Sequence, residues 1–202
     1  MALFRDLIRT VSEAEGLSEM AVTGIGQYLR DAGLISKLGR GRAAAKMTSE
    51  DAAHLLIGVN ATALAKDAPN VVSAYKAIKG REDVYPIELE SAEEDYVSRA
   101  LFRPEDPVQC LSRLIGCYTK QGSADPVLSE RSYAVSITFR RPVPRLELWI
   151  GWRSDDPDQL DEPLCILNFY DAGAKSLSAG DKRDTTTISE VTLAAVGRIL
   201  AA

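Results

Sequence analysis

A short run of basic residues stands out in this acidic chain. Lys37, Arg40, Arg42 and Lys46 follow one another with no carboxylate among them. Glycines on either side of the first arginine let the backbone turn tightly and approach another group closely. Ammonium and guanidinium groups bind phosphate oxygens, so this run suggests contact with a nucleic-acid backbone. We expect residues 36–47 to form a hairpin that presents these cations.

The composition of the whole chain restricts where such binding can occur. The chain has 202 residues and a net charge of −5, with 46% hydrophobic and 26% charged residues. This balance is ordinary for a folded protein, and an acidic protein binds nucleic acid only through a local positive patch. The first residues show no signal-peptide pattern, and no apolar run reaches the roughly 18 residues that would span a bilayer. We therefore expect a cytoplasmic protein without membrane contact.

Two helices are predicted before the basic run. Residues 2–15 place apolar side chains at helical spacing, and Gly16 is suited to end this helix. Leu17 is expected to pack inward. Ser18 is expected to cap a second helix, which continues to about Ala32.

A third helix is predicted directly after the basic run. Thr48 is expected to cap it, and Asp51 at its third position completes a pattern similar to a capping box. Its inward side chains are expected to be Ala52, Leu55, Leu56 and Val59. Residues 70–79 predict one more helix, closed by Gly80.

The arrangement of these helices is typical of one DNA-binding motif. A helix-turn-helix needs a small residue in its first helix, a glycine at the turn and inward apolar residues that set the crossing of the two helices. Those positions are held by Ser12, Gly16, Leu17, Val22 and Ile25. The segment from 8 to 47 resembles the winged helix-turn-helix family of bacterial and phage DNA-binding proteins. The wing region of that family is similar in three features: the tripeptide Gly33-Leu34-Ile35, the hairpin with Gly39-Arg40-Gly41-Arg42, and the helix that begins at 47–48.

The resemblance implies a recognition helix over 18–32 and a cationic wing beside it. Its outward residues would be Ser18, Glu19, Thr23, Gln27 and Arg30, which suit phosphate and base-edge contacts. The implied DNA-binding residues are Ser18, Thr23, Gln27, Arg30, Lys37, Arg40, Arg42 and Lys46.

Three residues depart from the family pattern. Glu15 stands where the motif usually has a small or apolar residue. Gly24 and Gly26 lie inside the recognition helix, where each costs about 1 kcal/mol relative to alanine. Glycines at these positions allow close approach to another helix or to DNA.

The last third of the chain changes character. Alternating apolar and polar residues predict strands over 132–139, 146–152 and 164–170. A helix is predicted over 107–119, and Ser189 is expected to cap a terminal helix. These elements predict a small antiparallel sheet flanked by helices.

The fold class that follows is α+β, in three parts. A winged helix-turn-helix domain is expected over 1–80 and an acidic connection over 81–104 with a short helix near its middle. An α+β domain for oligomerisation or partner binding is expected over 105–202.

No cluster of residues predicts catalysis, a metal site or a cofactor. An odd number of cysteines, Cys110, Cys117 and Cys165, does not suggest a disulfide framework. His54 is expected to be packed or partly exposed, since no second ligand accompanies it. The acidic loop over 154–163 lacks the glycine and glutamate pattern of a calcium loop.

Three functions are compatible with these observations. The first is sequence-specific binding of duplex DNA by a transcriptional regulator of bacterial or phage type, acting as a homodimer or higher homo-oligomer. The second is a DNA-packaging recognition subunit of a phage. The third is an adaptor or inhibitor that binds another protein and no DNA. An enzyme is not expected.

Overall fold

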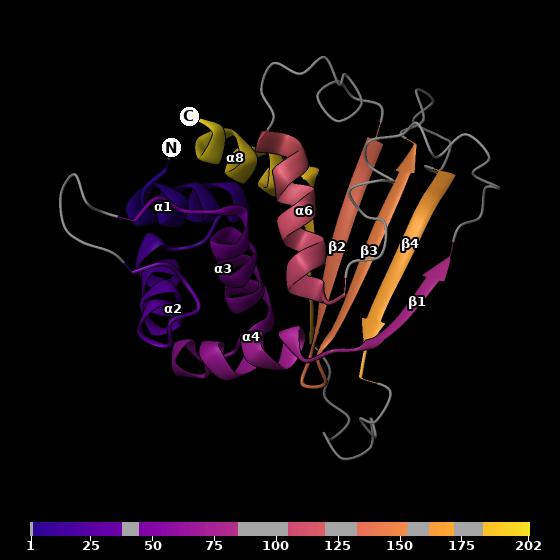
Figure 1. Cartoon of the computed structure of the whole chain (residues 1–202), viewed down its shortest axis with the longest axis horizontal. Coiled ribbons are helices and arrows are strands. Elements are labelled where there is room, and N and C mark those ends of the chain that lie inside the picture. The colour runs from indigo at the N-terminus through magenta and orange to yellow at the C-terminus, as the bar shows by residue number, and fades with distance from the viewer. Residues whose placement is uncertain (1, 38–44, 85–104, 120–132, 153–161, 172–183) are drawn as a thin grey trace.

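The computed structural model describes residues 2–37, 45–84, 105–119, 133–152, 162–171 and 184–202. Within these ranges the fold is α+β, with the helices on one side of a single antiparallel sheet (Figure 1). The α+β class expected from the sequence is confirmed. The winged helix-turn-helix within it stays a prediction.

The helical layer consists of helices from the first 76 residues together with two helices from later in the chain. Its α-helices are α1 (Phe4–Glu15), α2 (Glu19–Asp31), α3 (Ser49–Ala61), α4 (Ala68–Lys76), α6 (Pro107–Thr119) and α8 (Glu190–Ala201), with a short 3₁₀ helix η2 (Ala65–Asp67). All six correspond to predicted helices, but α4 ends at Lys76, and Gly80, which was expected to close this helix, begins β1 instead.

The sheet has five strands in the order β1-β4-β3-β2-β5, and each neighbouring pair is antiparallel. The strands are β1 (Gly80–Val84), β2 (Tyr133–Arg141), β3 (Arg145–Trp152), β4 (Glu162–Tyr170) and β5 (Asp184–Ser189). The three central strands are those predicted from alternation. The two edge strands are not: β1 lies where the acidic connection was expected to begin, and β5 lies between residues 170 and 189, where no strand was predicted.

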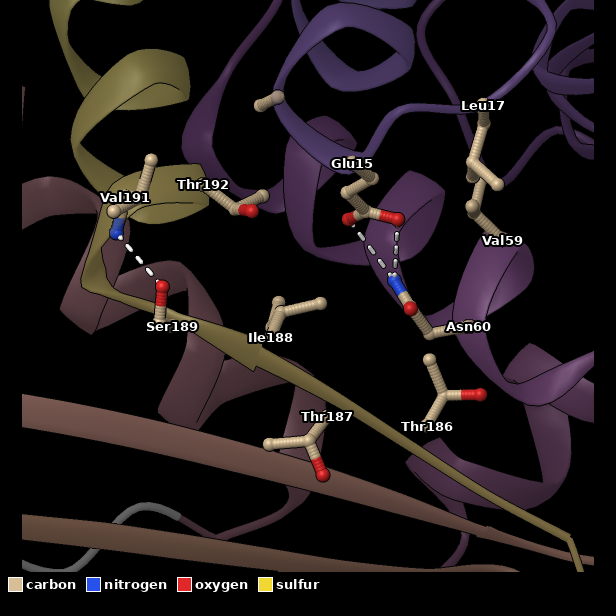
Figure 2. Close-up of a pocket in the computed structure, with 11 residues that line it drawn as sticks. Glu15, Leu17, Val59, Asn60, Thr186, Thr187, Ile188, Ser189, Val191 and Thr192 are labelled. Atoms are coloured by element: carbon tan, nitrogen blue, oxygen red, sulfur yellow. Dashed lines mark hydrogen bonds between the residues drawn. The ribbon is translucent and has the colours of Figure 1, made fainter.

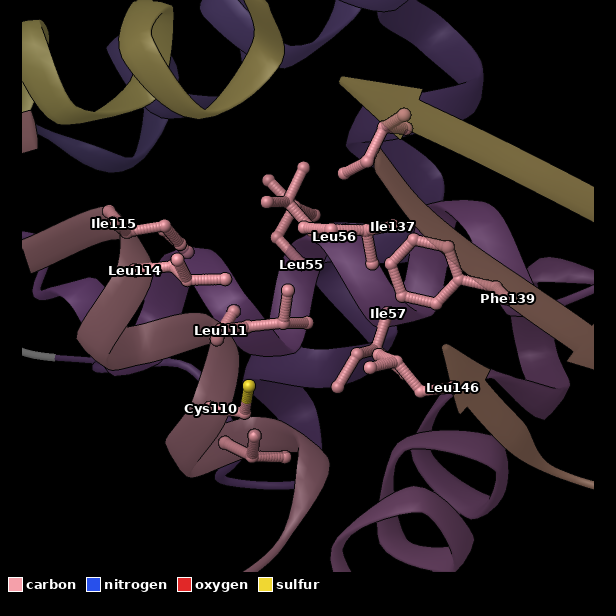
Figure 3. Packing of buried hydrophobic residues seen from close by; sticks show 14 of the residues in the cluster. Leu55, Leu56, Ile57, Cys110, Leu111, Leu114, Ile115, Ile137, Phe139 and Leu146 are labelled. Atoms are coloured by element: carbon pink, nitrogen blue, oxygen red, sulfur yellow. The ribbon is translucent and has the colours of Figure 1, made fainter. Parts of the chain in front are cut away.

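Helix α3 is the centre of the molecule. Its residues are buried on nearly all sides, and it packs against α2, α4 and α6 as well as against β2. Figure 3 shows Leu111 and Leu114 of α6 facing Leu55 and Leu56 of α3, with Phe139 of β2 beside them. A helix that is apolar all round must be covered on every side, which explains this position.

One cluster of buried side chains runs through the helices and the sheet. The cluster includes residues from both sides of the boundary expected at residue 80. In addition, α1 packs against α8, which comes from the other end of the chain. The division into parts at residues 80 and 104 stays a prediction, and residues 85–104 lie outside the described ranges. The short helix near residue 91 and most of the acidic loop over 154–163 lie outside them too.

One inward residue was predicted wrongly. Leu17 is 43% exposed, whereas the motif pattern predicted that it would pack inward. It lies in the turn between α1 and α2, where it lines a cavity with Val59. In the described part of the chain, none of the helices has the length and apolar character that crossing a membrane requires.

Candidate nucleic-acid interface

Helices α1 and α2 form a closely packed pair joined by a three-residue turn. Gly16 takes a φ of 66°, and the Leu17 N–H donates to the Ser12 carbonyl at 2.8 Å. A Cβ atom on Gly26 would lie 2.8 Å from side-chain atoms of both Phe4 and Ile8. Glycine at position 26 therefore permits the close approach of α1. Of the two explanations expected for this glycine, contact with another helix is the one observed.

A single buried carboxylate joins the two ends of the basic run. Asp51 Oδ1 accepts the Ser36 N–H at 2.8 Å, on the chain that enters the run. Asp51 Oδ2 accepts the backbone N–H and the hydroxyl of Thr48 at 2.8 and 2.9 Å, on the chain that leaves it. The Thr48 hydroxyl accepts the Asp51 N–H in return, so the expected capping box is confirmed. The residues on either side of the segment 37–47 are therefore bonded to one side chain; we call residues 37–47 the basic loop.

The entering end of the basic loop is fixed by two further contacts. Ile35 is buried, and the Leu34 carbonyl accepts from Nδ1 of His54 at 2.6 Å. His54 is itself buried, and burial lowers its pKa, so the ring is neutral with its proton on Nδ1. His54 is thus a structural residue of α3, in line with the packed position predicted for it.

The leaving end of the basic loop lies along the start of the chain. Lys46 forms an antiparallel bridge with Leu3, and the Met47 N–H donates to the Ala2 carbonyl at 2.9 Å. The next residue, Phe4, has the Arg30 guanidinium over its ring at 4.5 Å from the ring centre. These contacts bring Lys46 and Arg30 to the same end of the α1–α2 pair.

Lys37 lies at this end as well. Its ammonium donates to Asp31 at 2.7 Å, and this carboxylate follows Arg30 at the end of α2. This hydrogen bond and the charge of the ammonium lower the pKa of Asp31, which favours the ionised carboxylate. We call Arg30, Lys37 and Lys46 the cationic cluster. Arg40 and Arg42 lie in the same loop, outside the described residues.

The other predicted contact residues lie along α2. Ser18 and Gln27 are exposed, and Thr23 is half-buried. Ser18 occupies the N-cap position, but its side chain makes no capping hydrogen bond. At 1.5 Å per residue, Ser18 lies about 18 Å along the helix from Arg30. The structure thus places the three described cations of the cationic cluster at one end of α2 and Ser18 at the other.

Sequence reasoning missed two residues near these elements. Arg5 is exposed in the first turn of α1, directly after the residue that stacks on Arg30. Arg5 lies two residues after Leu3, which bridges Lys46, and that pairing has no signal in the sequence. Glu15 was noted as a departure from the motif without a role.

Glu15 faces a cavity of about 540 Å³ between the ends of α1 and α3 and the β5–α8 corner (Figure 2). Its two carboxylate oxygens lie 3.1 and 3.2 Å from Nδ2 of Asn60. Burial raises the pKa of Glu15 to about 7, and the Asn60 hydrogen bond opposes this only in part. This cavity is separate from the cationic cluster, since it lies at the C-terminal end of α1.

Within the described ranges, no group of three or more histidine, cysteine, aspartate or glutamate side chains is placed to hold a metal ion. No protein-family model, curated protein or solved structure matches this chain.

Proposed function

We propose that the chain binds duplex DNA through the basic loop and the adjoining end of α2. The observation on which this depends is the attachment of both loop ends to Asp51. Because Ser36 and Thr48 are both bonded to this buried carboxylate, the segment between them, which carries four cations, begins and ends at one place. A local positive patch of this kind can bind phosphates although the chain as a whole is acidic.

The cationic cluster adds a second support for the proposal. Arg30 lies over Phe4, next to the Leu3 that bridges Lys46, so its charge adds to those of the loop. Gln27 is exposed one turn before Arg30 on the same face of α2, where it is suited to base-edge contacts. In this arrangement the loop provides affinity and α2 provides sequence preference.

The charges on α2 limit how it can approach DNA. Glu19 begins the helix and Asp31 ends it, so phosphates are repelled at both ends unless cations offset them. Lys37 offsets Asp31, whereas Glu19 has no cation beside it in the helix sequence. We therefore place the DNA backbone at the loop end of α2 and away from its first turn.

The test removes the two arginines of the loop. Arg40→Ala with Arg42→Ala is expected to weaken binding to random duplex DNA about tenfold or more at low salt. It is also expected to lower the slope of log affinity against log salt by about 2, because two phosphate contacts are lost. Fluorescence anisotropy with a labelled duplex measures both.

A matched control removes the same charge elsewhere. Lys79→Ala with Arg140→Ala takes two cations from the sheet side of the molecule, where both residues are exposed. This control is expected to keep most of the affinity and the salt slope. Equal losses from the two double variants would show that binding follows net charge alone and would refute the loop assignment.

Within this proposal the chain is a transcriptional regulator of bacterial or phage type. One short helix gives little sequence specificity, and a homodimer that reads two half-sites multiplies it. Light scattering of the protein in solution measures the mass of the assembly. A dimer agrees with the regulator, whereas a large ring would favour the packaging subunit.

A further inference from the structure

The cavity beside Glu15 has the size of a small-molecule site. Its volume of about 540 Å³ lies within the range of about 300 to 1,000 Å³ usual for ligand pockets. Three segments far apart in the chain form it: the end of α1 with its turn, the end of α3, and strand β5 with the start of α8. Figure 2 shows Glu15 and Asn60 together at one side, with residues of β5 and α8 across the opening.

The hydrogen bonds of this corner leave acceptors without donors. Asn60 Nδ2 donates to Glu15 and also to the Leu56 carbonyl at 3.0 Å, which uses the hydrogens of its amide. One nitrogen therefore serves both oxygens of Glu15, which together have room for about four hydrogen bonds. Among the described residues, no lysine or arginine pairs with this carboxylate.

The rest of the lining divides into hydroxyl groups and aliphatic side chains. Thr186 and Thr192 contribute hydroxyls, whereas Val59, Ile188 and Val191 contribute apolar surface. Among the described residues that line the cavity, Glu15 alone is ionisable. An acceptor-rich end next to an aliphatic wall suits a ligand that has a cationic donor on a short hydrocarbon chain.

We propose that this cavity binds a small aliphatic amine, with the ligand's ammonium group held by Glu15 and Asn60 Oδ1. Three kinds of contact then act together. The ammonium donates to the carboxylate and the amide oxygen, the threonine hydroxyls accept its remaining hydrogen, and the methylene groups lie along the valines and Ile188. The site belongs to no part of the DNA-binding proposal, and its test uses no DNA.

The charged groups nearby have partners outside the cavity. On the lining elements, Glu190 accepts the Val135 N–H at 3.2 Å and Asp184 pairs with Arg141 at 3.4 Å. Arg9 of α1 pairs with Asp6 of the same helix, and neither residue lines the cavity. Asp51, at the opposite end of α3, is bonded to the basic loop. Glu13 is exposed on α1 and is the nearest further carboxylate in the sequence.

The test is calorimetric titration of the full chain with putrescine at two pH values. Because burial raises the pKa of Glu15 to about 7, about a tenth of the carboxylates are ionised at pH 6 and about nine-tenths at pH 8. Putrescine keeps its charge over this range, so its affinity is expected to rise about tenfold from pH 6 to pH 8. Glu15→Gln keeps the shape of the side chain and is expected to lower the affinity at pH 8 at least tenfold.

Two controls make the result decisive. Glu13→Gln removes the same charge from the exposed side of the same helix and is expected to leave putrescine binding unchanged. Sorbitol, a neutral polyol of comparable size, is expected not to bind. The proposal is overturned if putrescine gives no heat at millimolar concentration, if the two glutamine variants bind alike, or if sorbitol binds instead.

Discussion

At the residue scale, one carboxylate works against the proposed interface. Asp31 holds the Lys37 ammonium at 2.7 Å, yet both side chains are more than half exposed. An exposed ion pair contributes little to stability, and the water around it lets the lysine exchange partners readily. Lys37 can therefore turn to a phosphate, but the charge of Asp31 stays beside it and repels that phosphate.

Asp31→Asn is accordingly expected to strengthen DNA binding. Removal of the negative charge frees Lys37 and should raise the affinity for random duplex roughly two- to fivefold at low salt. The fold should tolerate this change, since a carboxylate at the C-terminal end of a helix is unfavourable. Anisotropy titrations are compared with Glu82→Gln, an exposed change in β1. An equal gain in both variants would contradict a local effect.

The raised pKa of Glu15 also predicts how the free energy of unfolding depends on pH. Its pKa is about 7 in the folded chain against 4.5 for the unperturbed group. The folded state therefore holds a proton that the unfolded state releases between these pH values, and stability falls as the pH rises through this window. Above pH 7 the carboxylate is ionised in both states, and the loss of folding stability is complete. A pKa shift of this size corresponds to about 3 kcal/mol.

Glu15→Gln removes this cost because glutamine does not ionise. The variant is expected to be more stable than the parent chain by roughly 2 to 3 kcal/mol at pH 8.5, and nearly equal to it at pH 4.5. Urea denaturation at the two pH values measures the difference, with Glu13→Gln as the exposed control. A difference that does not change with pH would contradict the buried position of this carboxylate.

At the element scale, the packing of α6 against α8 depends on one glycine. A Cβ atom on Gly197 would collide with Tyr118, including its backbone carbonyl carbon at 2.9 Å. Backbone atoms cannot move aside as a side-chain tip does, so the two helices would have to separate. Gly116 on the same pair of helices has open space around it.

The two glycines predict opposite effects of the same substitution. Gly197→Ala is expected to destabilise the chain by about 2 to 3 kcal/mol through overpacking. Gly116→Ala is expected to stabilise it by up to about 1 kcal/mol, because alanine is the better helix former. Thermal and urea denaturation of both variants check this. If both substitutions stabilise the chain, α6 and α8 do not approach as closely as described.

Local signals explain which elements could be predicted from the sequence. Thr48 and Asp51 satisfy backbone groups at the start of α3, so the same pattern that stabilises the helix also identifies it. The central strands alternate because one face of the sheet is covered by helices. Edge strand β5 has three threonines in succession, whose β-branched side chains were the available signal. Edge strand β1 is charged and short, and only its pairing with β4 identifies it.

The candidate sites were less predictable because contacts distant in sequence build them. The basic loop itself is visible in its composition, but Asp51 joining Ser36 to Thr48 is a tertiary feature. Arg30 was expected to point outward, yet it stacks on Phe4, a residue from another helix. Likewise, the cavity at Glu15 includes β5, which was not expected to be a strand.

At the scale of the whole molecule, one continuous apolar core carries two differently charged regions on its outside. The helices and the sheet share one cluster of buried side chains. The charged side chains at the two ends of α1 are therefore attached to one continuous packed core. The cationic cluster and the Glu15 cavity lie at opposite ends of α1. In the proposed function, the net charge of −5 opposes DNA binding by the chain as a whole, and only a local group of cations offsets it.

The most direct test of this account is the salt dependence of binding to random duplex DNA. If the four cations of the basic loop neutralise phosphates, log affinity falls with log salt with a slope of about −3 to −4. Between 50 and 200 mM salt the affinity should then drop about a hundredfold. No detectable binding at 50 mM salt, or a slope near zero, would contradict the central claim that this acidic chain binds DNA through one cationic end.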